Sequence, residues 1–307
     1  MIDVALPSRR FRAGPRGSGH AAGCTLWGKG PSGQLLFSSS EPMEKGDHSG
    51  FHHAFDTCKG SMILQFDATE AGDAATLSPN GETLALFTSG KDGEHPVRLY
   101  DVRRKLKDAS QTAELEKFRA RPTVNPDQEL DESGEVNQAS FSPDGCLLAV
   151  ARNDNALHVY DMRALSRGPL CRFEHHDSDA IGGGGFGIVA VNWIQGRDRI
   201  GIVSGGNDGR SLIQSPYLLD TNCLTGCVRL WEPALGATGD VQGMVIGRSD
   251  FDVGHFSIGN PQNGELPLIM YESYLLYGGV CLILFPSGDS GGGVHTYDFT
   301  NADGTPI

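Results

Sequence analysis

The segment VRLYD (97–101) has counterparts at four other places in the chain: HHAFD (52–56), LHVYD (157–161), VRLWE (228–232) and VHTYD (294–298). Each is a short strand-forming run that ends in an aromatic residue followed by an acid. Four of the five follow a polar turn rich in Gly, Asn or Asp. Self-similarity every few tens of residues indicates units that bury their apolar faces only against one another. The sequence therefore predicts a stacked array of small β-sheets.

The composition suits many short strands joined by tight turns. Of the 307 residues, 42 are Gly, and Gly is the residue that turns most often require. The net charge of −13 argues against broad electrostatic binding to nucleic acid or to an anionic membrane. No window holds the ~18 uninterrupted apolar residues of a membrane span. Neither nucleic acid nor a membrane is therefore expected as a partner.

The cysteines and the N-terminal residues indicate the cellular compartment of the protein. Seven cysteines without CxxC spacing indicate reduced thiols and a cytoplasmic or nuclear protein. Residues 1–19 lack the apolar core of a secretory signal. We interpret them as a disordered tail. A mitochondrial transit segment is the alternative, because the tail contains several arginines and few acids.

Each repeat divides into four short strands. In the clearest one, an alternating run (136–141) leads into the tight turn SPDG (142–145) and the apolar run CLLAVA (146–151), as a strand buried on both faces requires. The repeat before it has the same order around SPNG (78–81). The predicted units cover residues 20–70, 71–120, 134–178, 186–247 and 248–307.

These turns, apolar runs and aromatic-acid endings resemble the WD40-repeat family over roughly residues 20–300. The resemblance implies an all-β, WD40-type β-propeller with five recognisable blades in residues 20–307. Whether these blades complete a ring stays open, as does whether the chain is truncated. An unrelated antiparallel β-sandwich is the alternative fold. The resemblance further implies a non-catalytic scaffold that binds proteins and needs no cofactor.

The resemblance also implies a hydrogen-bonded cluster in each blade. It joins an acid in the turn before the third strand to a His, a Ser or Thr and the aromatic residue of that strand. Only one copy has Trp and Gly-His pairs are mostly missing, so partial clusters are expected, with His176 as the best matching histidine. The positions assigned to this structural pattern are the turn acids Asp92, Asp154, Asp208 and Asp289, the aromatic residues Tyr100, Tyr160, Trp231 and Tyr297, and the strand-ending acids Asp101 and Asp161.

Two successive repeats end in Tyr-Asp-x-Arg, at 100–103 and 160–163. This ending resembles that of propellers that act as substrate receptors of cullin-RING ubiquitin ligases. The resemblance implies adaptor binding by Arg103 and Arg163, whose guanidinium groups can make bidentate contacts. The alternative is that each Arg caps its turn or pairs with a local acid.

Three motifs could indicate catalysis or ligand binding, but none has the sequence surroundings that this chemistry requires. GDSGG (288–292) resembles the nucleophile motif of trypsin-like serine proteases, in which Ser290 would attack a carbonyl. It lies where a blade turn is due, and no Ala-Ala-His-Cys segment precedes it. GGGGFG (182–187) precedes a strand, whereas a phosphate loop precedes a helix. The histidine pairs 52–53 and 175–176 would need further ligands at suitable geometry to bind a metal, and we interpret them as strand and turn histidines. We predict that the protein is not an enzyme, with a serine hydrolase as the alternative.

Three segments interrupt the repeats. Residues 104–135 are charged, begin with a helix-like pattern and are predicted to form an exposed loop. Residues 210–226 separate SGGNDG from CVRLWE, and 270–287 separate GELPLI from GDSGGGVHTYD. We interpret the last two as translated introns. In the first, residues 220–222 can be encoded around the branch-point sequence TACTAAC, and in the second, CLILFPS (281–287) suits a pyrimidine-rich tract before an acceptor site. Ordinary surface loops are the alternative.

Overall fold

The computed structural model describes the parts of the chain that form the repeats. These are residues 19–44, 46–89, 94–103, 113–119, 135–175, 187–195, 200–211, 223–231, 233, 243–249, 252–257, 268–273 and 294–297. They divide into two compact units, which are described separately: residues 1–124 with 134–136, and residues 125–133 with 137–307. In the described residues, no helix is long and apolar enough to cross a membrane.

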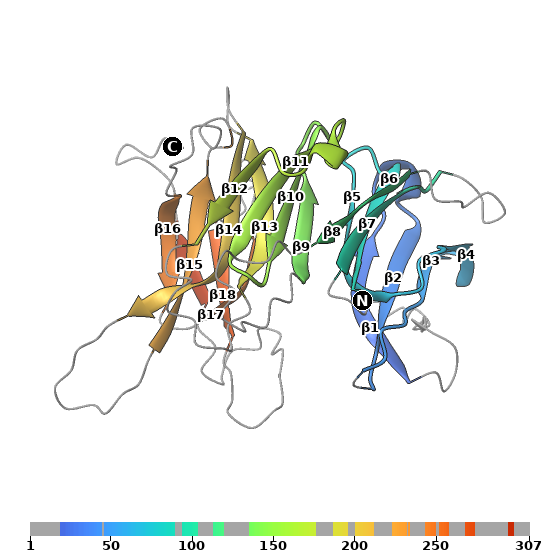
Figure 1. Cartoon of the computed structure of the whole chain (residues 1–307), viewed down its shortest axis with the longest axis horizontal. Helices are drawn as coiled ribbons and strands as arrows, with labels where there is room; N and C mark the ends of the chain where they lie inside the picture. The colour runs from blue at the N-terminus through green and yellow to red at the C-terminus, as the bar shows by residue number, and fades with distance from the viewer. Residues whose placement is uncertain are drawn as a thin grey trace, which may run out of the picture. The chain divides into compact units, whose positions relative to one another are not determined.

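The first unit contains two four-stranded antiparallel sheets whose strands follow chain order, β1-β2-β3-β4 and β5-β6-β7-β8 (Figure 1). The strands are β1 (His20–Trp27), β2 (Leu35–Pro42), β3 (His52–Asp56), β4 (Ser61–Gln65), β5 (Ala71–Leu77), β6 (Thr83–Ser89), β7 (Glu94–Asp101) and β8 (Ala113–Arg119). We refer to these sheets as blades 1 and 2.

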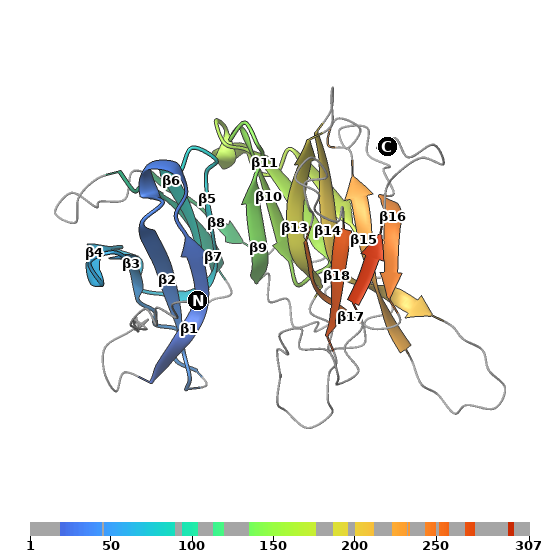
Figure 2. The same cartoon turned by 180° about the vertical axis from the view of Figure 1, so that it is seen from behind.

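The second unit continues the pattern with two four-stranded sheets and one of three strands, here called blades 3, 4 and 5. Their strands are β9 (Val136–Phe141), β10 (Leu147–Arg152), β11 (Ala156–Asp161), β12 (Cys171–Glu174), β13 (Ile188–Gln195), β14 (Ile200–Ser211), β15 (Cys223–Trp231), β16 (Met244–Ser249), β17 (Asp252–Ser257), β18 (Leu268–Ser273) and β19 (Val294–Tyr297). In Figure 2, β17 lies beside the strands of blade 4, which it contacts.

The second strands of blades 2 and 3 lie inside their sheets and are buried along almost their whole length. In β6 the five central residues are buried, and in β10 every residue after Leu147 is buried. Sequences of this kind lack strict alternation because no face of the strand meets water. The apolar runs seen in the sequence therefore correspond to interior strands.

The aromatic residue that ends a third strand packs against the blade before it. Tyr100 of β7 lies with its ring centroid 4.7 Å from that of Phe66, which follows β4. Trp231 of β15 lies 5.0 Å from Phe173 of β12. Both aromatic side chains are almost completely buried. The recurrent aromatic residue thus joins consecutive sheets into one core, which explains why it recurs.

The structure corrects the prediction for the charged segment 104–135. Residues 113–119 form β8, the fourth strand of blade 2, and Arg98 of β7 is opposite Glu114. The helix-like start and the loop assignment were therefore wrong for these residues, because pairing with β7 outweighs the local helical pattern. The rest of the segment lies outside the described residues.

The two segments interpreted as introns partly enter strands. Residues 210–211 and 223–226 belong to β14 and β15, while 270–273 are the last four residues of β18. The predicted boundary between 247 and 248 also lies inside β16. The remaining residues of both segments lie outside the described residues, so the intron interpretation stays a prediction.

Candidate protein-interaction surface

The turn between the first and second strands has the same hydrogen bonds in blades 2 and 3. Ser78 Oγ donates to Asn80 Oδ1 at 2.6 Å and accepts from the backbone N–H of Thr83 at 2.9 Å. Ser142 Oγ likewise donates to Asp144 Oδ1 at 2.6 Å and accepts from Leu147 N–H at 2.8 Å. The Gly that ends each turn has a φ of 72°, a left-handed conformation that favours Gly.

The turn that follows each third strand is held by its Asp. The Asp101 carboxylate accepts hydrogen bonds from Arg103 Nε at 3.0 Å and Nη2 at 2.8 Å. Asp161 accepts the same pair from Arg163, at 2.9 and 2.8 Å. Hydrogen bonds from the side chain and backbone of Arg163 lower the pKa of Asp161 to about 2. Each guanidinium is therefore paired with its local acid, the second of the two readings that the sequence allowed.

These two kinds of turn meet at the same edge of each blade. Val102 N–H donates to Glu82 O, and Met162 N–H donates to Cys146 O, both at 2.9 Å. The Arg103 side chain is 56% exposed and that of Arg163 is 76% exposed. Bidentate pairing fixes the guanidinium while leaving it accessible. We call these two places, 78–82 with 101–103 and 142–146 with 161–163, the arginine turns.

Blade 1 has a variant of the arginine turn. Asp56 Oδ1 accepts from the backbone N–H groups of Cys58 and Lys59, each at 2.9 Å, and Lys59 Nζ lies 3.3 Å from Asp56 Oδ2. A cation thus follows the strand-ending acid in three blades. Because only Arg offers a planar, two-pronged donor, the two arginine turns are the stronger candidates for recognition.

The predicted polar cluster is most complete in blade 4. Trp231 Nε1 donates to Ser204 Oγ at 2.7 Å, and His175 Nε2 lies 2.7 Å from the same oxygen. The histidine in contact is His175 rather than His176, which lies outside the described residues. His175 N–H donates to Asn155 O, which extends the β11–β12 ladder by one residue and places the His175 side chain in the interior. This cluster joins blade 3 to blade 4.

Blades 2 and 3 replace this cluster with other contacts. Tyr100 OH donates to Asp67 Oδ1 at 2.7 Å, and Tyr160 OH lies 3.1 Å from His158 Nδ1. Asp154 accepts a hydrogen bond from Ala156 N–H at 3.1 Å and pairs with Arg152 at 3.0 Å. These two contacts take the place of the expected link to a histidine. Of the remaining positions, Asp92 and Asp289 lie outside the described residues. Asp208 and Tyr297 lie in β14 and β19, but their side chains are not described.

Sequence reasoning missed a buried ion pair in blade 2. Arg98, in the VRLYD segment, is 7% exposed. Its Nη2 donates to Glu70 Oε1 at 2.7 Å, and its Nη1 donates to Thr88 Oγ1 at 2.9 Å. His52 Nε2 lies 2.8 Å from Glu70 O, which connects blade 1 to this pair. The one available signal was an Arg inside an otherwise apolar strand, because a buried charge needs a partner.

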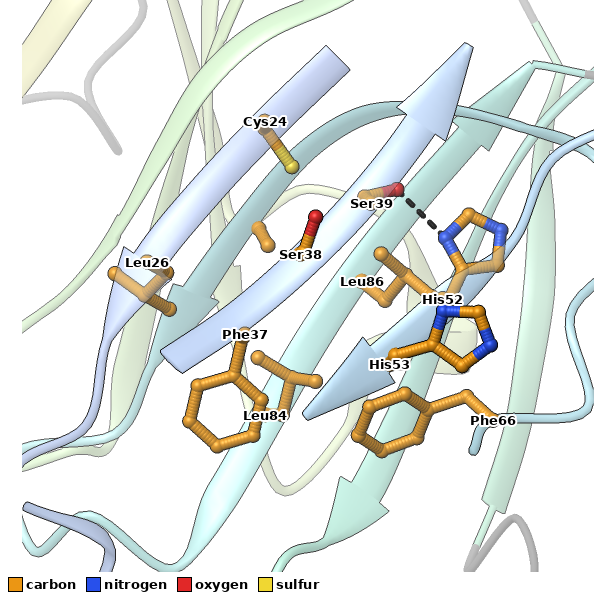
Figure 3. A pocket seen from close by; sticks show the side chains of 11 residues that line it. Cys24, Leu26, Phe37, Ser38, Ser39, His52, His53, Phe66, Leu84 and Leu86 are labelled. Carbon is orange, nitrogen blue, oxygen red and sulfur yellow. Dashed lines mark hydrogen bonds between the residues drawn. The ribbon is translucent and has the colours of Figure 1, made fainter. Parts of the chain in front are cut away.

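A small cavity between blades 1 and 2 contains the arrangement of described residues that comes nearest to a catalytic one. Ser39 Oγ lies 2.6 Å from His52 Nδ1, and Cys24 lies beside them (Figure 3). The cavity volume is about 10 Å³, enough for about one water. Burial raises the pKa of the Cys24 thiol to about 12, which keeps it protonated. The cavity therefore has no room for a substrate. Within the described residues, no group of His, Cys, Asp and Glu could hold a metal ion.

Comparison with known proteins identifies the fold. No protein-family model and no curated protein sequence matches the chain. The "Structure of Dos1 propeller" is similar, with a TM-score of 0.53 and 15% identity, over 82% of this chain and 52% of that chain. The "Crystal Structure of Mitotic Checkpoint Complex" is also similar, with a TM-score of 0.53 and 15% identity, over 84% of this chain and 61% of that chain.

These similarities confirm the predicted all-β, β-propeller fold. The chain spans about half of the first matched chain and three fifths of the second. At 15% identity the likeness concerns the fold alone.

Two of the buried histidines, His52 and His175, predict how stability depends on pH. Burial lowers the pKa of His52 to about 4 and that of His175 to about 3. Both stay neutral in the folded protein, while the unfolded chain takes up protons below pH 6.5. Stability should therefore be complete above pH 6.5 and fall as the pH decreases toward 4. Melting temperatures from pH 7 to pH 4.5 test this. The His52→Gln/His175→Gln variant should show a flatter dependence, and an unchanged slope would contradict the assignment.

Proposed function

We propose that this protein is a non-catalytic scaffold that binds other proteins through the edge of its blades. The observation that carries the proposal is the pair of arginine turns. In each, an exposed guanidinium is held in a fixed position by an Asp of the same turn. Pre-ordered surface groups lose little conformational entropy on binding, and Arg is enriched at interfaces. The propeller fold supports this role by analogy. The unpatterned cysteines favour a cytoplasmic or nuclear site of action.

The proposal is tested by removing both guanidinium groups of the arginine turns. Arg103 and Arg163 would be replaced by Ala together in the full tagged chain. Proteins recovered with it would be compared quantitatively with those recovered by the wild type. Loss of a dominant interface side chain should weaken partner recovery about tenfold or more, equivalent to 1.4 kcal/mol.

The matched control is Arg172→Ala. Arg172 is also exposed and ion-paired, with its Nη2 2.9 Å from Glu174 Oε1, but it lies on β12, away from both turns. Recovery should be unchanged in this control. Equal recovery by the wild type and the Arg103→Ala/Arg163→Ala variant would refute the assignment of the arginine turns.

A second, narrower function is adaptor binding as a substrate receptor of a cullin-RING ubiquitin ligase. The exposure of both arginines after Tyr-Asp-x favours it. A cullin adaptor among the recovered proteins, lost in the double arginine variant, would support this role. Recovery of other partners without an adaptor would leave the general scaffold and exclude the receptor.

A serine hydrolase is the competing class. Ser290 lies outside the described residues. The experiment that separates this class from a scaffold is incubation of the full chain with a fluorophosphonate probe. We expect no labelling, and labelling that disappears in a Ser290→Ala variant would favour the hydrolase.

A further inference from the structure

The hairpin of blade 4 leaves its sheet where the repeat is interrupted. The β13–β14 ladder ends at the pair Ile188 and Gly206, and Gly206 is also opposite Cys227 of β15. Beyond this point the register of β14 shifts between Asn207 and Arg210. The ends of β14 and β15 extend past the other strands of the sheet (Figure 2). A two-stranded ribbon is at best marginally stable by itself, so this extension adds nothing to the blade core.

The corresponding hairpin of blade 3 shows how a short turn closes the same ladder. The aromatic residue of each third strand sets the register: Tyr160 is opposite Leu148, and Trp231 is opposite Ile202. Four residues from each of these pairs toward the turn lie Arg152 and Ala156 in blade 3. The corresponding residues in blade 4 are Gly206 and Cys227. In blade 3 the turn between them is Asn153, Asp154 and Asn155.

Removing residues 210–226 leaves a turn of the same length and chemistry in blade 4. The three residues between Gly206 and Cys227 would then be Asn207, Asp208 and Gly209. In blade 3 the central Asp154 accepts from the N–H of Ala156, a role that Asp208 can fill toward Cys227.

The third residue of the turn provides an independent match. Asn155 has a φ of 59°, in the left-handed region where Asn is tolerated and Gly is favoured. Asn155 has the only positive φ among the described non-glycine residues. The shortened chain places Gly209 at this position. The two turns therefore agree in length, in their central Asp and in a third residue that tolerates a left-handed conformation. In the longer chain Asn207 to Gly209 lie in strand β14.

We infer that residues 210–226 are a removable insertion, and that the protein exists in a form without them whose blade 4 closes through Asn207–Gly209 as blade 3 closes through Asn153–Asn155. This inference concerns blade 4 alone and does not depend on the proposed function. The sequence alone marked this segment as an interruption, and the structure adds the turn, Asn207–Gly209, that would close the hairpin once the segment is removed.

Peptide mass spectrometry of the protein from cells that express its gene tests whether the short form exists. Trypsin would release IGIVSGGNDGCVR, residues 200–209 joined to 227–229, from the short form. The longer chain gives IGIVSGGNDGR, residues 200–210. Detection of the junction peptide is the expected result. Its absence while the 200–210 peptide is found would overturn the existence of the short form.

Stability tests the turn itself. Replacing a turn of about 20 residues by one of three lowers the entropy cost of closing the hairpin, so the melting temperature of the short form should rise by about 2–5 °C. Gly209→Val should reverse this gain in the short form, because Val is strained at positive φ. In the longer chain Gly209 lies at the irregularity of β14 between Asn207 and Arg210, outside a three-residue turn, and the same change should have a smaller effect. A short form that melts lower than the longer chain, or Gly209→Val effects that are equal in both, would overturn the proposed turn.

Discussion

Replacing Trp231 by Ala is expected to lower the free energy of unfolding by about 3–5 kcal/mol, the range for removal of a buried aromatic side chain. Trp231 is 1% exposed and its ring packs on Phe173 of the preceding blade. The change leaves a cavity between blades 3 and 4. It also removes the indole N–H that donates to Ser204 Oγ. Urea unfolding followed by far-ultraviolet circular dichroism measures the loss.

Two further variants show which part of the Trp231 side chain matters. Trp231→Phe retains a ring against Phe173 but loses the hydrogen bond to Ser204, so about 1–2 kcal/mol of the loss should remain. Trp27→Ala is the matched control, because Trp27 is 62% exposed and its removal should change stability by no more than about 0.5 kcal/mol. Equal effects of Trp231→Ala and Trp27→Ala would show that blades 3 and 4 do not share this contact.

Replacing Glu70 by Ala is expected to destabilise the protein by about 2–3 kcal/mol, because it leaves the buried Arg98 guanidinium without its counter-charge. This figure lies below the usual cost of breaking a buried pair because the Glu70 side chain is 29% exposed and solvent screens part of the interaction. Chemical unfolding at pH 7 measures the effect. Glu70→Ala combined with Arg98→Met should recover part of the loss, since no buried charge then remains.

The exposed pair Arg172–Glu174 is the control for this experiment. Both side chains are about half exposed, so Glu174→Ala should cost no more than about 1 kcal/mol. Burial acts to raise the pKa of Glu70, but the hydrogen bond and charge of Arg98 outweigh it and hold that pKa below its ordinary value. The contribution of Glu70 should therefore be present at neutral pH and be lost as the pH falls below about 4.5. A Glu70→Ala cost that does not exceed that of Glu174→Ala would contradict a buried pair.

Local chemistry explains why much of the fold could be predicted from the sequence. The SPNG and SPDG turns depend on residues two to five positions apart, such as Ser142 with Asp144 and Leu147. Two of the strand-ending aromatic residues, Tyr100 and Trp231, pack on an aromatic residue of the sheet before them. Asp101 and Asp161 hold the turns that follow them, so adjacent residues decide their position. Contacts of this kind can be predicted from a single sequence because the residues that make them recur in successive repeats.

Contacts between distant residues explain what could not be predicted. Glu70 and Arg98 are 28 residues apart, and His175 and Ser204 are 29 apart. The first pair lies within blade 2 and the second joins blade 3 to blade 4. Each blade uses different polar residues, so no repeated pattern reveals these contacts. The strand β8 was missed because its charged sequence, AELEKFR, favours a helix locally. Pairing with β7 decides its structure instead.

The repeats therefore share apolar packing more than polar chemistry. Blade 4 uses Trp231 with Ser204 and His175, while blade 2 uses Arg98 with Thr88 and Glu70. The arginine turns are the exception, since their hydrogen bonds are the same in blades 2 and 3. We assign the arginine turns the role in binding because the same geometry occurs at exposed positions in both blades.

Thiol footprinting of Cys146 is the measurement that tests this assignment most directly. Cys146 is exposed and its carbonyl oxygen accepts from Met162 N–H beside Arg163, so a partner on this arginine turn must cover it. Alkylation would be followed by mass spectrometry with and without the proteins recovered by affinity purification, with the buried Cys171 and Cys227 as internal controls. Burial of an interface residue predicts that the partner slows alkylation of Cys146 by about tenfold or more. An unchanged rate at Cys146 in the presence of a bound partner would contradict the account.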